Sequence, residues 1–127
     1  MADNWNFMTV RELADLVRDR QVSPVELAEH FLDRLEKLGP EYNAVVTLTR
    51  ERALEEARAA ETEINGGTYR GPLHGIPVGL KDIFDVSGVP TTAASAIPRT
   101  DVSETDSECA ERLRGAGAII LGKLNLH

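Results

Sequence analysis

A lysine stands inside an apolar stretch in the second half of the chain. The stretch "HGIPVGLKDIFDV" covers residues 74–86, and Lys81 lies near its middle with Asp82 beside it. An amine buried in such a stretch is costly to keep charged, so it gives up its proton more readily than an amine in water. A neutral amine is a general base that can take a proton from a serine hydroxyl, directly or through a second hydroxyl. Lys81 is therefore a candidate general base.

The same stretch also fits a half-buried strand. Successive side chains of a strand point to opposite faces, so Ile76, Val78 and Leu80 would face inward while Lys81 pointed to water. The outer face would share the lysine with a proline and a glycine, neither of which offers a polar side chain. Such a bare face is typical of a place where a ligand or another backbone segment approaches closely. Both interpretations stay open on these residues alone.

A second segment resembles a phosphate-binding loop and then departs from it. "GAIILGKL", residues 117–124, matches the pattern G-x-x-x-x-G-K, but Leu124 stands where a serine or threonine should hold magnesium. The four middle residues, 118–121, have the composition of a buried strand rather than of a flexible loop. We therefore expect no nucleotide site here.

The remaining reactive side chains indicate no metal or redox chemistry. His30 has Glu26 four residues before it on a charged helix face, and no zinc or calcium spacing is present. Cys109 is the single cysteine, which excludes an internal disulfide and fits a reducing compartment. Its acidic neighbours favour a buried or inert thiol. No metal and no cofactor are expected.

The overall charge limits the class of partner. The chain has 21 acidic and 14 basic residues and a net charge of −7. This balance argues against direct binding to nucleic acid or to an anionic membrane, because both need basic residues on one face. No apolar run has the length of a membrane span, and the N-terminus lacks the features of a signal peptide. We expect a cytoplasmic protein that acts on a small molecule.

Helices are predicted to fill the first half of the chain. The capping boxes "TVRE" at residues 9–12 and "SPVE" at residues 23–26 predict the starts of two amphipathic helices. Gly39-Pro40 is expected to end the second helix. A short strand over 43–49 then precedes a third helix over about 50–64, with apolar residues at helical spacing.

The second half is typical of an α/β core. A fourth helix is expected to be capped by Thr105 or Asp106, and the apolar run 118–122 predicts a strand buried on both faces. Such a strand needs neighbours, and few strands precede it. The predicted fold class is α/β, with N-terminal helices (1–67) followed by the start of a helix-covered mixed sheet (68–127), incomplete as given.

The motifs together resemble a known family. "GPLHGIPVGLKDIFDVSGVPTTAAS", residues 71–95, is similar to the N-terminal part of the amidase signature family, and "GAGAIILGKLN" follows in the family's order. The resemblance covers nearly all of residues 1–127, which would form the N-terminal part of a single amidase-signature domain. Ala94 and Leu124 depart from the pattern, since glycine and threonine are usual there.

This resemblance implies a chemistry for the lysine. The family hydrolyses or transfers at carboxamide bonds through a Ser–cis-Ser–Lys triad, in which Lys81 would be the lysine. The middle serine would relay the proton of the nucleophilic serine to Lys81, and an acyl-enzyme would form and be released by water. The implied substrate is a small-molecule carboxamide, and the resemblance implies no metal or organic cofactor.

The two serines of that triad are expected beyond residue 127. None of the serines of this chain lies in the glycine-rich motif that the family uses: Ser23 is interpreted as a helix cap, Ser87 as a turn residue and Ser95 as a structural loop residue. The 127-residue chain alone is therefore expected to be inactive.

Two further functions stay open beside the amidase. One is the glutaminase subunit of a tRNA-dependent amidotransferase, a relative in the same family, although "LKDIFDV" and the ending "NLH" look more like the general amidases. The other is a non-catalytic truncated remnant, or a helical interaction module built from residues 1–65. The sequence does not specify the amide substrate or the oligomeric state.

Overall fold

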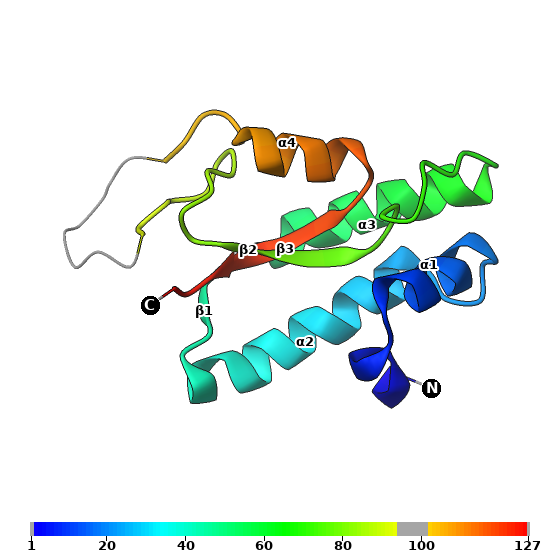
Figure 1. The fold of residues 1–127 in the computed structure, drawn as a ribbon, viewed down its shortest axis with the longest axis horizontal. Helices are drawn as coiled ribbons and strands as arrows, with labels where there is room; N and C mark the ends of the chain where they lie inside the picture. The colour runs from blue at the N-terminus through cyan, green and yellow to red at the C-terminus, as the bar shows by residue number, and fades with distance from the viewer. Residues whose placement is uncertain (1, 94–101, 127) are drawn as a thin grey trace.

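The computed structural model describes residues 2–93 and 102–126, which form helices packed on a small mixed sheet (Figure 1). In the sheet, of order β1-β3-β2, β3 pairs antiparallel with β1 and parallel with β2. Helices α2 and α3 cover one face and α4 covers the other, which confirms the predicted helix-covered mixed sheet. The elements are a 3-10 helix (Ala2–Phe7), α1 (Val10–Arg18), α2 (Pro24–Tyr42), β1 (Val45–Leu48), α3 (Arg50–Asn65), β2 (Pro77–Lys81), α4 (Glu108–Gly115) and β3 (Ile119–Leu124).

Strand β3 is buried on both faces, as its continuous apolar run predicted. Ile119 and Leu121 pack against α2 and α3, whereas Ile120 packs with α4 and with Leu80 of β2. At Gly122 a Cβ atom would lie only 2.2 Å from the Thr47 carbonyl oxygen of β1. The central strand therefore needs a glycine at this position for β1 to approach.

The first two helices begin where the capping boxes predicted. The Glu12 N–H donates to Thr9 Oγ1 over 3.2 Å, and the Glu12 carboxylate accepts from the Thr9 N–H over 2.7 Å. The hydrogen bond from the Thr9 backbone holds the pKa of the Glu12 carboxyl below its ordinary value. Ser23 and Glu26 repeat the arrangement at the start of α2.

The predicted end of the second helix was wrong. Helix α2 continues through Gly39 and Pro40 to Tyr42, and Asn43 ends it in the left-handed conformation with a φ of 50°. A Cβ on Gly39 would lie 2.9 Å from Val45 Cγ2, so this glycine lets β1 approach the helix. The glycine thus reflects a close contact rather than a stop signal.

The predicted cap of the fourth helix was also wrong. Ser107, not Thr105 or Asp106, is the N-cap of α4, and its hydroxyl accepts from the Ala110 N–H over 3.3 Å. The Asp106 carboxylate instead accepts from the Ser87 N–H over 2.8 Å. Three adjacent residues could each cap a helix, and a long-range partner for Asp106 decided between them.

A buried histidine joins α3 to the segment that leads into β2. His74 is 1% exposed, its Nδ1 accepts from the Arg70 N–H over 3.0 Å, and its Nε2 lies 2.9 Å from a carboxylate oxygen of Glu63. Burial lowers the pKa of His74, although the Glu63 carboxylate acts in the opposite direction. The Arg70 guanidinium in turn lowers the pKa of Glu63.

The buried His74 makes the stability depend on pH. Because its pKa is lower in the folded than in the unfolded chain, the unfolded chain binds the proton more tightly. We expect the free energy of unfolding to fall as the pH drops from about 6.5 through the folded pKa. His74→Gln should weaken this dependence, and His30→Gln should leave it in place. Urea unfolding between pH 5 and 7 measures it, and equal slopes for wild type and His74→Gln would contradict the expectation.

Two glycines, one inside β3 and one at the end of α4, give opposite predictions for stability. Gly122→Ala places a methyl group against the β1 backbone and should lower the free energy of unfolding by about 2–3 kcal/mol. Gly115→Ala, at the end of α4 with no atom within 4 Å of its Cβ, should raise it by about 0.5 kcal/mol. Chemical denaturation of the two variants beside the wild type measures both. A Gly122→Ala variant as stable as the wild type would refute the tight contact.

Candidate active site

Lys81 is the last residue of β2, where the parallel pair of strands reaches its carboxyl end. It lies opposite Leu124 of β3 in the register of the two strands. In sheets covered by helices, ligands bind at the carboxyl ends of parallel strands. The lysine therefore stands at an edge of the sheet that suits a site.

The side chain of Lys81 is exposed, whereas Leu80 before it is only 6% exposed. This confirms the half-buried strand and corrects the interpretation of a buried amine. The physical reason is the alternation of a strand, which turns Lys81 away from the face on which Leu80 packs with Val86 and Ile120. Within residues 2–93 and 102–126, no hydrogen bond or ion pair of the Lys81 amine is present.

The segment after Lys81 turns back over the end of the sheet. The Asp82 N–H donates to the Leu124 carbonyl over 2.9 Å, and the Phe84 N–H donates to the Lys81 carbonyl over 3.1 Å. Val86 and Val89, both at most 3% exposed, pack with Ile120. The backbone on each side of the lysine is thus held by β3 and by its own turn.

The structure places a second lysine at this edge that sequence reasoning did not single out. Lys123 of β3 is 1% exposed, and its Nζ lies 3.4 Å from Asp82 Oδ1 and 3.0 Å from Thr91 Oγ1. Asp82 is fully buried, and its Oδ2 accepts from the hydroxyl and the N–H of Thr92. The lysine directly after a buried apolar run, and the aspartate directly after Lys81, were the available signals.

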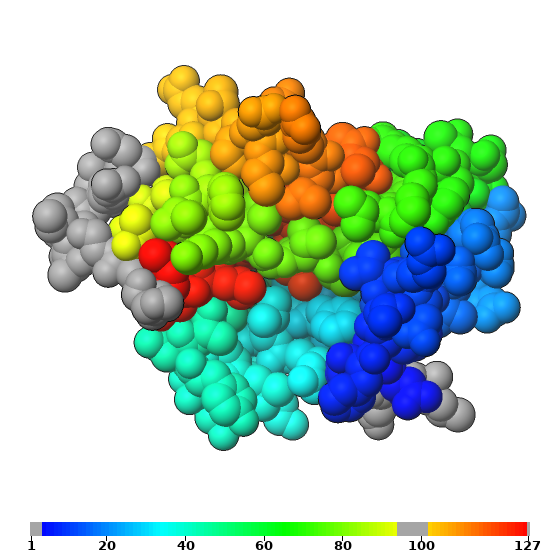
Figure 2. Space-filling view, in the orientation of Figure 1, coloured from blue at the N-terminus to red at the C-terminus, as the bar shows by residue number. Residues whose placement is uncertain are grey.

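An open apolar groove of about 440 Å³ lies on the other face of the same strands. A Cβ on Gly79, two residues before Lys81, would lie 2.8 Å from Leu124 Cδ1, so the glycine keeps this face free of bulk. In Figure 2 the red C-terminal strand emerges between the green segment that contains β2 and the cyan end of α2. The sheet contributes Pro77, Gly79, Leu121 and Leu124 to the groove, and α2 contributes Leu35, Leu38 and Tyr42.

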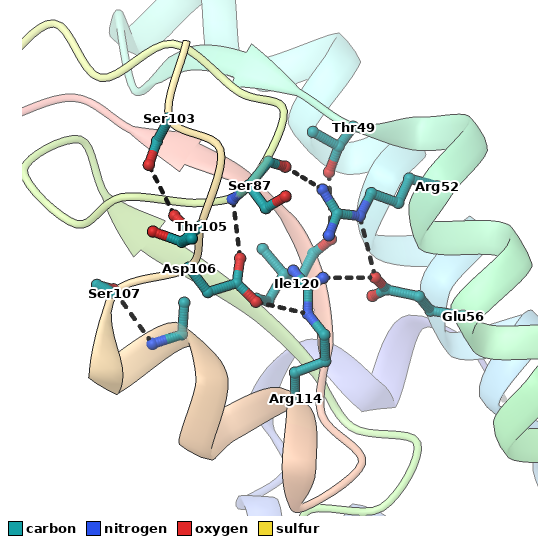
Figure 3. Close-up of polar contacts among 11 residues, drawn as sticks. Thr49, Arg52, Glu56, Ser87, Ser103, Thr105, Asp106, Ser107, Arg114 and Ile120 are labelled. Carbon is teal, nitrogen blue, oxygen red and sulfur yellow. Dashed lines mark hydrogen bonds and ion pairs between the residues drawn. The ribbon is translucent and has the colours of Figure 1, made fainter.

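An ionic network ties the segment that follows β2 to two helices (Figure 3). Arg114 of α4 lies 3.2 Å from a carboxylate oxygen of Glu56 of α3 and 3.4 Å from one of Asp106. Asp106 binds the Ser87 N–H, and Arg52 of α3 donates to the Ser87 carbonyl. The turn at Ser87, which the sequence predicted, is therefore fixed from both α3 and α4.

The other serines that the sequence considered have structural roles or lie outside the described residues. Ser23 caps α2, as predicted, and the hydroxyl of Ser103 donates to the Thr105 carbonyl over 2.7 Å. Ser95, like Ala94, is not among the described residues. Within residues 2–93 and 102–126, no serine hydroxyl forms a hydrogen bond with the Lys81 amine.

The structure also places the other residues that the sequence singled out, namely the phosphate-loop pattern, His30 and Cys109. Three of the four middle residues of the phosphate-loop pattern, 119–121, lie in β3, which confirms the expected strand at this place. The His30 Nε2–H donates to Asn6 Oδ1 over 2.7 Å, and the His30 ring packs edge-on against Trp5. Cys109 was expected to be buried or inert, and the first alternative was wrong, since the residue lies exposed on α4 beside the buried Ala110. Residues 2–93 and 102–126 contain no cluster of three or more metal-binding side chains, and none of their helices has the length and apolarity to cross a bilayer.

The sequence is similar to known enzymes along most of its length. It is 48% identical over 118 residues to the A subunit of the glutamyl-tRNA(Gln) amidotransferase of Azoarcus sp. strain BH72. It is 41% identical over 117 residues to the putative amidase AmiD of Mycobacterium tuberculosis strain H37Rv. These matches cover 93% and 92% of this chain but only 24% and 25% of the relatives. The chain thus spans about a quarter of the length of these relatives.

The fold is similar to solved structures over the same span. The native peptide amidase of Stenotrophomonas maltophilia superposes with a TM-score of 0.87 at 34% identity, over 94% of this chain and 25% of that enzyme. A crystal structure of an amidase superposes with a TM-score of 0.84 at 37% identity, over 94% and 27%. The family model described as Amidase matches residues 26–127, which include Lys81 and all three strands. The chain belongs to the amidase family.

Proposed function

We propose that this chain supplies the general base, Lys81, of an enzyme that hydrolyses carboxamide C–N bonds. The observation that carries the proposal is the exposed amine at the carboxyl end of β2, in a chain that matches amidases over 94% of its length. An exposed amine at that edge can reach a hydroxyl presented by another segment, which a lysine pointing into the core could not do. The substrate proposed is a small carboxamide.

The proposed reaction follows the Ser–cis-Ser–Lys scheme. A serine oxygen attacks the carboxamide carbon while its proton passes to a middle serine, whose own proton passes to the neutral Lys81 amine. The C–N bond then breaks, the amine leaves with a proton, and an acyl-enzyme remains. Water attacks the acyl group, and the acid and the free serine result. The two serines are proposed to come from residues other than these 127, so the chain alone is proposed to be inactive.

The groove gives Lys81 a setting that can favour the neutral amine. Charged amines are stabilised by water and disfavoured next to apolar surface. Pro77, Gly79 and Leu124 form an apolar surface beside the end of β2. Covering this surface during assembly of the active site would remove water from the lysine and prepare it to accept a proton.

A second candidate function is the glutaminase subunit of an amidotransferase. The observation that favours it is the 48% identity to the A subunit of a glutamyl-tRNA(Gln) amidotransferase, above the 41% to the putative amidase. In this function the carboxamide would be that of glutamine, and the released ammonia would pass to a partner subunit. Glutamine hydrolysis that requires added partner subunits would favour this function, and hydrolysis of simple amides without partners would favour the amidase.

The role of Lys81 can be tested in the polypeptide that the natural reading frame encodes. Lys81→Ala should lower kcat/KM for amide hydrolysis by about 10³-fold or more, because a positioned base contributes about 10²–10⁴-fold. Lys37→Ala is the matched control, since Lys37 is exposed on α2, and it should leave the rate unchanged. Release of ammonia or amine measures the rate, and circular dichroism checks the fold. A folded Lys81→Ala enzyme with wild-type turnover would refute the assignment.

A further inference from the structure

Two opposite charges lie buried together at the end of the sheet, next to the proposed base. Lys123 and Asp82 are 1% and 0% exposed, and 3.4 Å separates Nζ from Oδ1. A buried charge without a partner is costly, and removing one member of such a pair leaves the other uncompensated. Thr91 and Thr92 complete the shell with hydroxyl groups on the ammonium and on the carboxylate. The cluster is therefore held as one unit.

This unit fixes the backbone that carries Lys81. The Asp82 N–H donates to the Leu124 carbonyl over 2.9 Å, and the Asp82 carbonyl accepts from the Ala93 N–H over 3.1 Å. The Asp82 side chain is bound at the same time to Lys123 and Thr92. Since Lys81 directly precedes Asp82, its backbone cannot turn without breaking these contacts.

The two lysines approach the edge from opposite faces. In the register of β2 and β3, Lys123 lies opposite Leu80, and Lys81 lies opposite Leu124. A shift of this register between Val78 and Gly79 changes the alternation of β3, as a bulge does, and brings Lys123 to the face of Asp82. Without this shift, Lys123 would lie on the same face of the sheet as Lys81, and two ammonium groups would share that face.

Within residues 2–93 and 102–126, charged side chains on the elements next to Lys81 come from three parts of the chain. The segment after β2 contributes Asp82 and Asp85, β3 contributes Lys123, and α2 contributes Arg34 across the groove. β1 contributes none. Asp85 accepts a 2.8 Å hydrogen bond from the Thr91 hydroxyl. Asp82 is the carboxylate nearest to Lys81 along the chain, and a carboxylate beside an amine favours its charged form.

We propose that Lys123 and Asp82 are positioning residues for Lys81, which fix the end of β2 and hold the Asp82 carboxylate on the Lys123 face of the sheet. This inference rests on the proposed role of Lys81 as the base. The pair compensates the carboxylate, so that it does not hold the Lys81 amine in its protonated form. The Lys123 ammonium thereby offsets the field of the Asp82 carboxylate at Lys81, and neither group touches the reacting atoms.

The test is an NMR titration of the 127-residue chain with ¹³C at the lysine ε-carbons. The chain has three lysines, so three resonances are expected, and Lys37→Met and Lys81→Met assign them. In Lys123→Met the uncompensated carboxylate should raise the titration midpoint of Lys81 by roughly half a pH unit. In Asp82→Asn the uncompensated ammonium should lower it by a similar amount. The double variant should return it to within about 0.2 units of the wild type.

Opposite shifts with return in the double variant support the proposal, because a purely structural role would not change sign. Midpoints that do not move, or that move in one direction in both variants, overturn it. Asp82→Asn keeps the size of the side chain and an acceptor for Thr92. If Lys123→Met does not fold, the shift of the Lys81 midpoint in Asp82→Asn alone decides whether the proposal holds. Loss of the fold in Asp82→Asn would assign the pair to stability alone and overturn the positioning role.

The titration and the activity test fail separately. An active Lys81→Ala enzyme would remove the proposed base and with it the purpose of the pair, whatever the titration shows. An inactive Lys81→Ala enzyme with unmoved midpoints would keep the base and overturn the positioning inference. In the natural polypeptide, Lys123→Met should also move the acid limb of the pH profile of kcat/KM upward, and Lys37→Met should not.

Discussion

The structure depends on the burial of β3 between two layers of helices. Its side chains alternate between α2 and α3 on one face and α4 on the other, so each helix has an apolar surface to cover. The strand also hydrogen-bonds to both other strands of the described sheet. At Gly122, β1 approaches so closely that its Thr47 carbonyl oxygen would clash with a Cβ atom on any other residue. The positions of β2 and Lys81 follow from β3, because their register is set by pairing with it.

Burial of β3 has a cost at its carboxyl end, where the apolar run gives way to Lys123. A lysine at the end of a strand usually reaches water, yet this one is 1% exposed. The segment after β2 folds over it and supplies Asp82 and Thr91 as partners. Arg52 of α3 and Asp106, which Arg114 of α4 binds, hold that segment at Ser87, so helices on both faces of the sheet contribute to one edge.

The sequence predicted those features that neighbouring residues determine. Both capping boxes form because their partners lie three residues apart, and the alternation of Leu80 and Lys81 needs only the geometry of a strand. Features that depend on distant partners were missed or wrong. Gly39 serves Val45 rather than a helix end, and Asp106 binds Ser87 instead of capping α4.

At the candidate site, too, the sequence predicted what neighbouring residues determine and missed what distant partners determine. Lys81 was singled out from its local stretch, and the structure places it at the carboxyl end of the parallel pair. Lys123 lay in a segment that was considered as a phosphate loop, as a buried strand and as a family motif, and none of these patterns indicates a partner 41 residues away. Pairing of Asp82 with Lys123 depends on the parallel register and its shift, which the residue pattern of either strand alone does not encode.

The exposure of Lys81 constrains how it could act as a base. An ammonium in water is stable at neutral pH, so a lysine that accepts protons must lose water from around it during assembly of the site. The apolar groove beside Gly79 makes such covering favourable, because each Å² of apolar surface removed from water stabilises by about 25 cal/mol. A carboxylate at the same edge would oppose the loss of the proton. The covered groove and the compensated Asp82 therefore act in the same direction, one by removing water and the other by removing a negative charge.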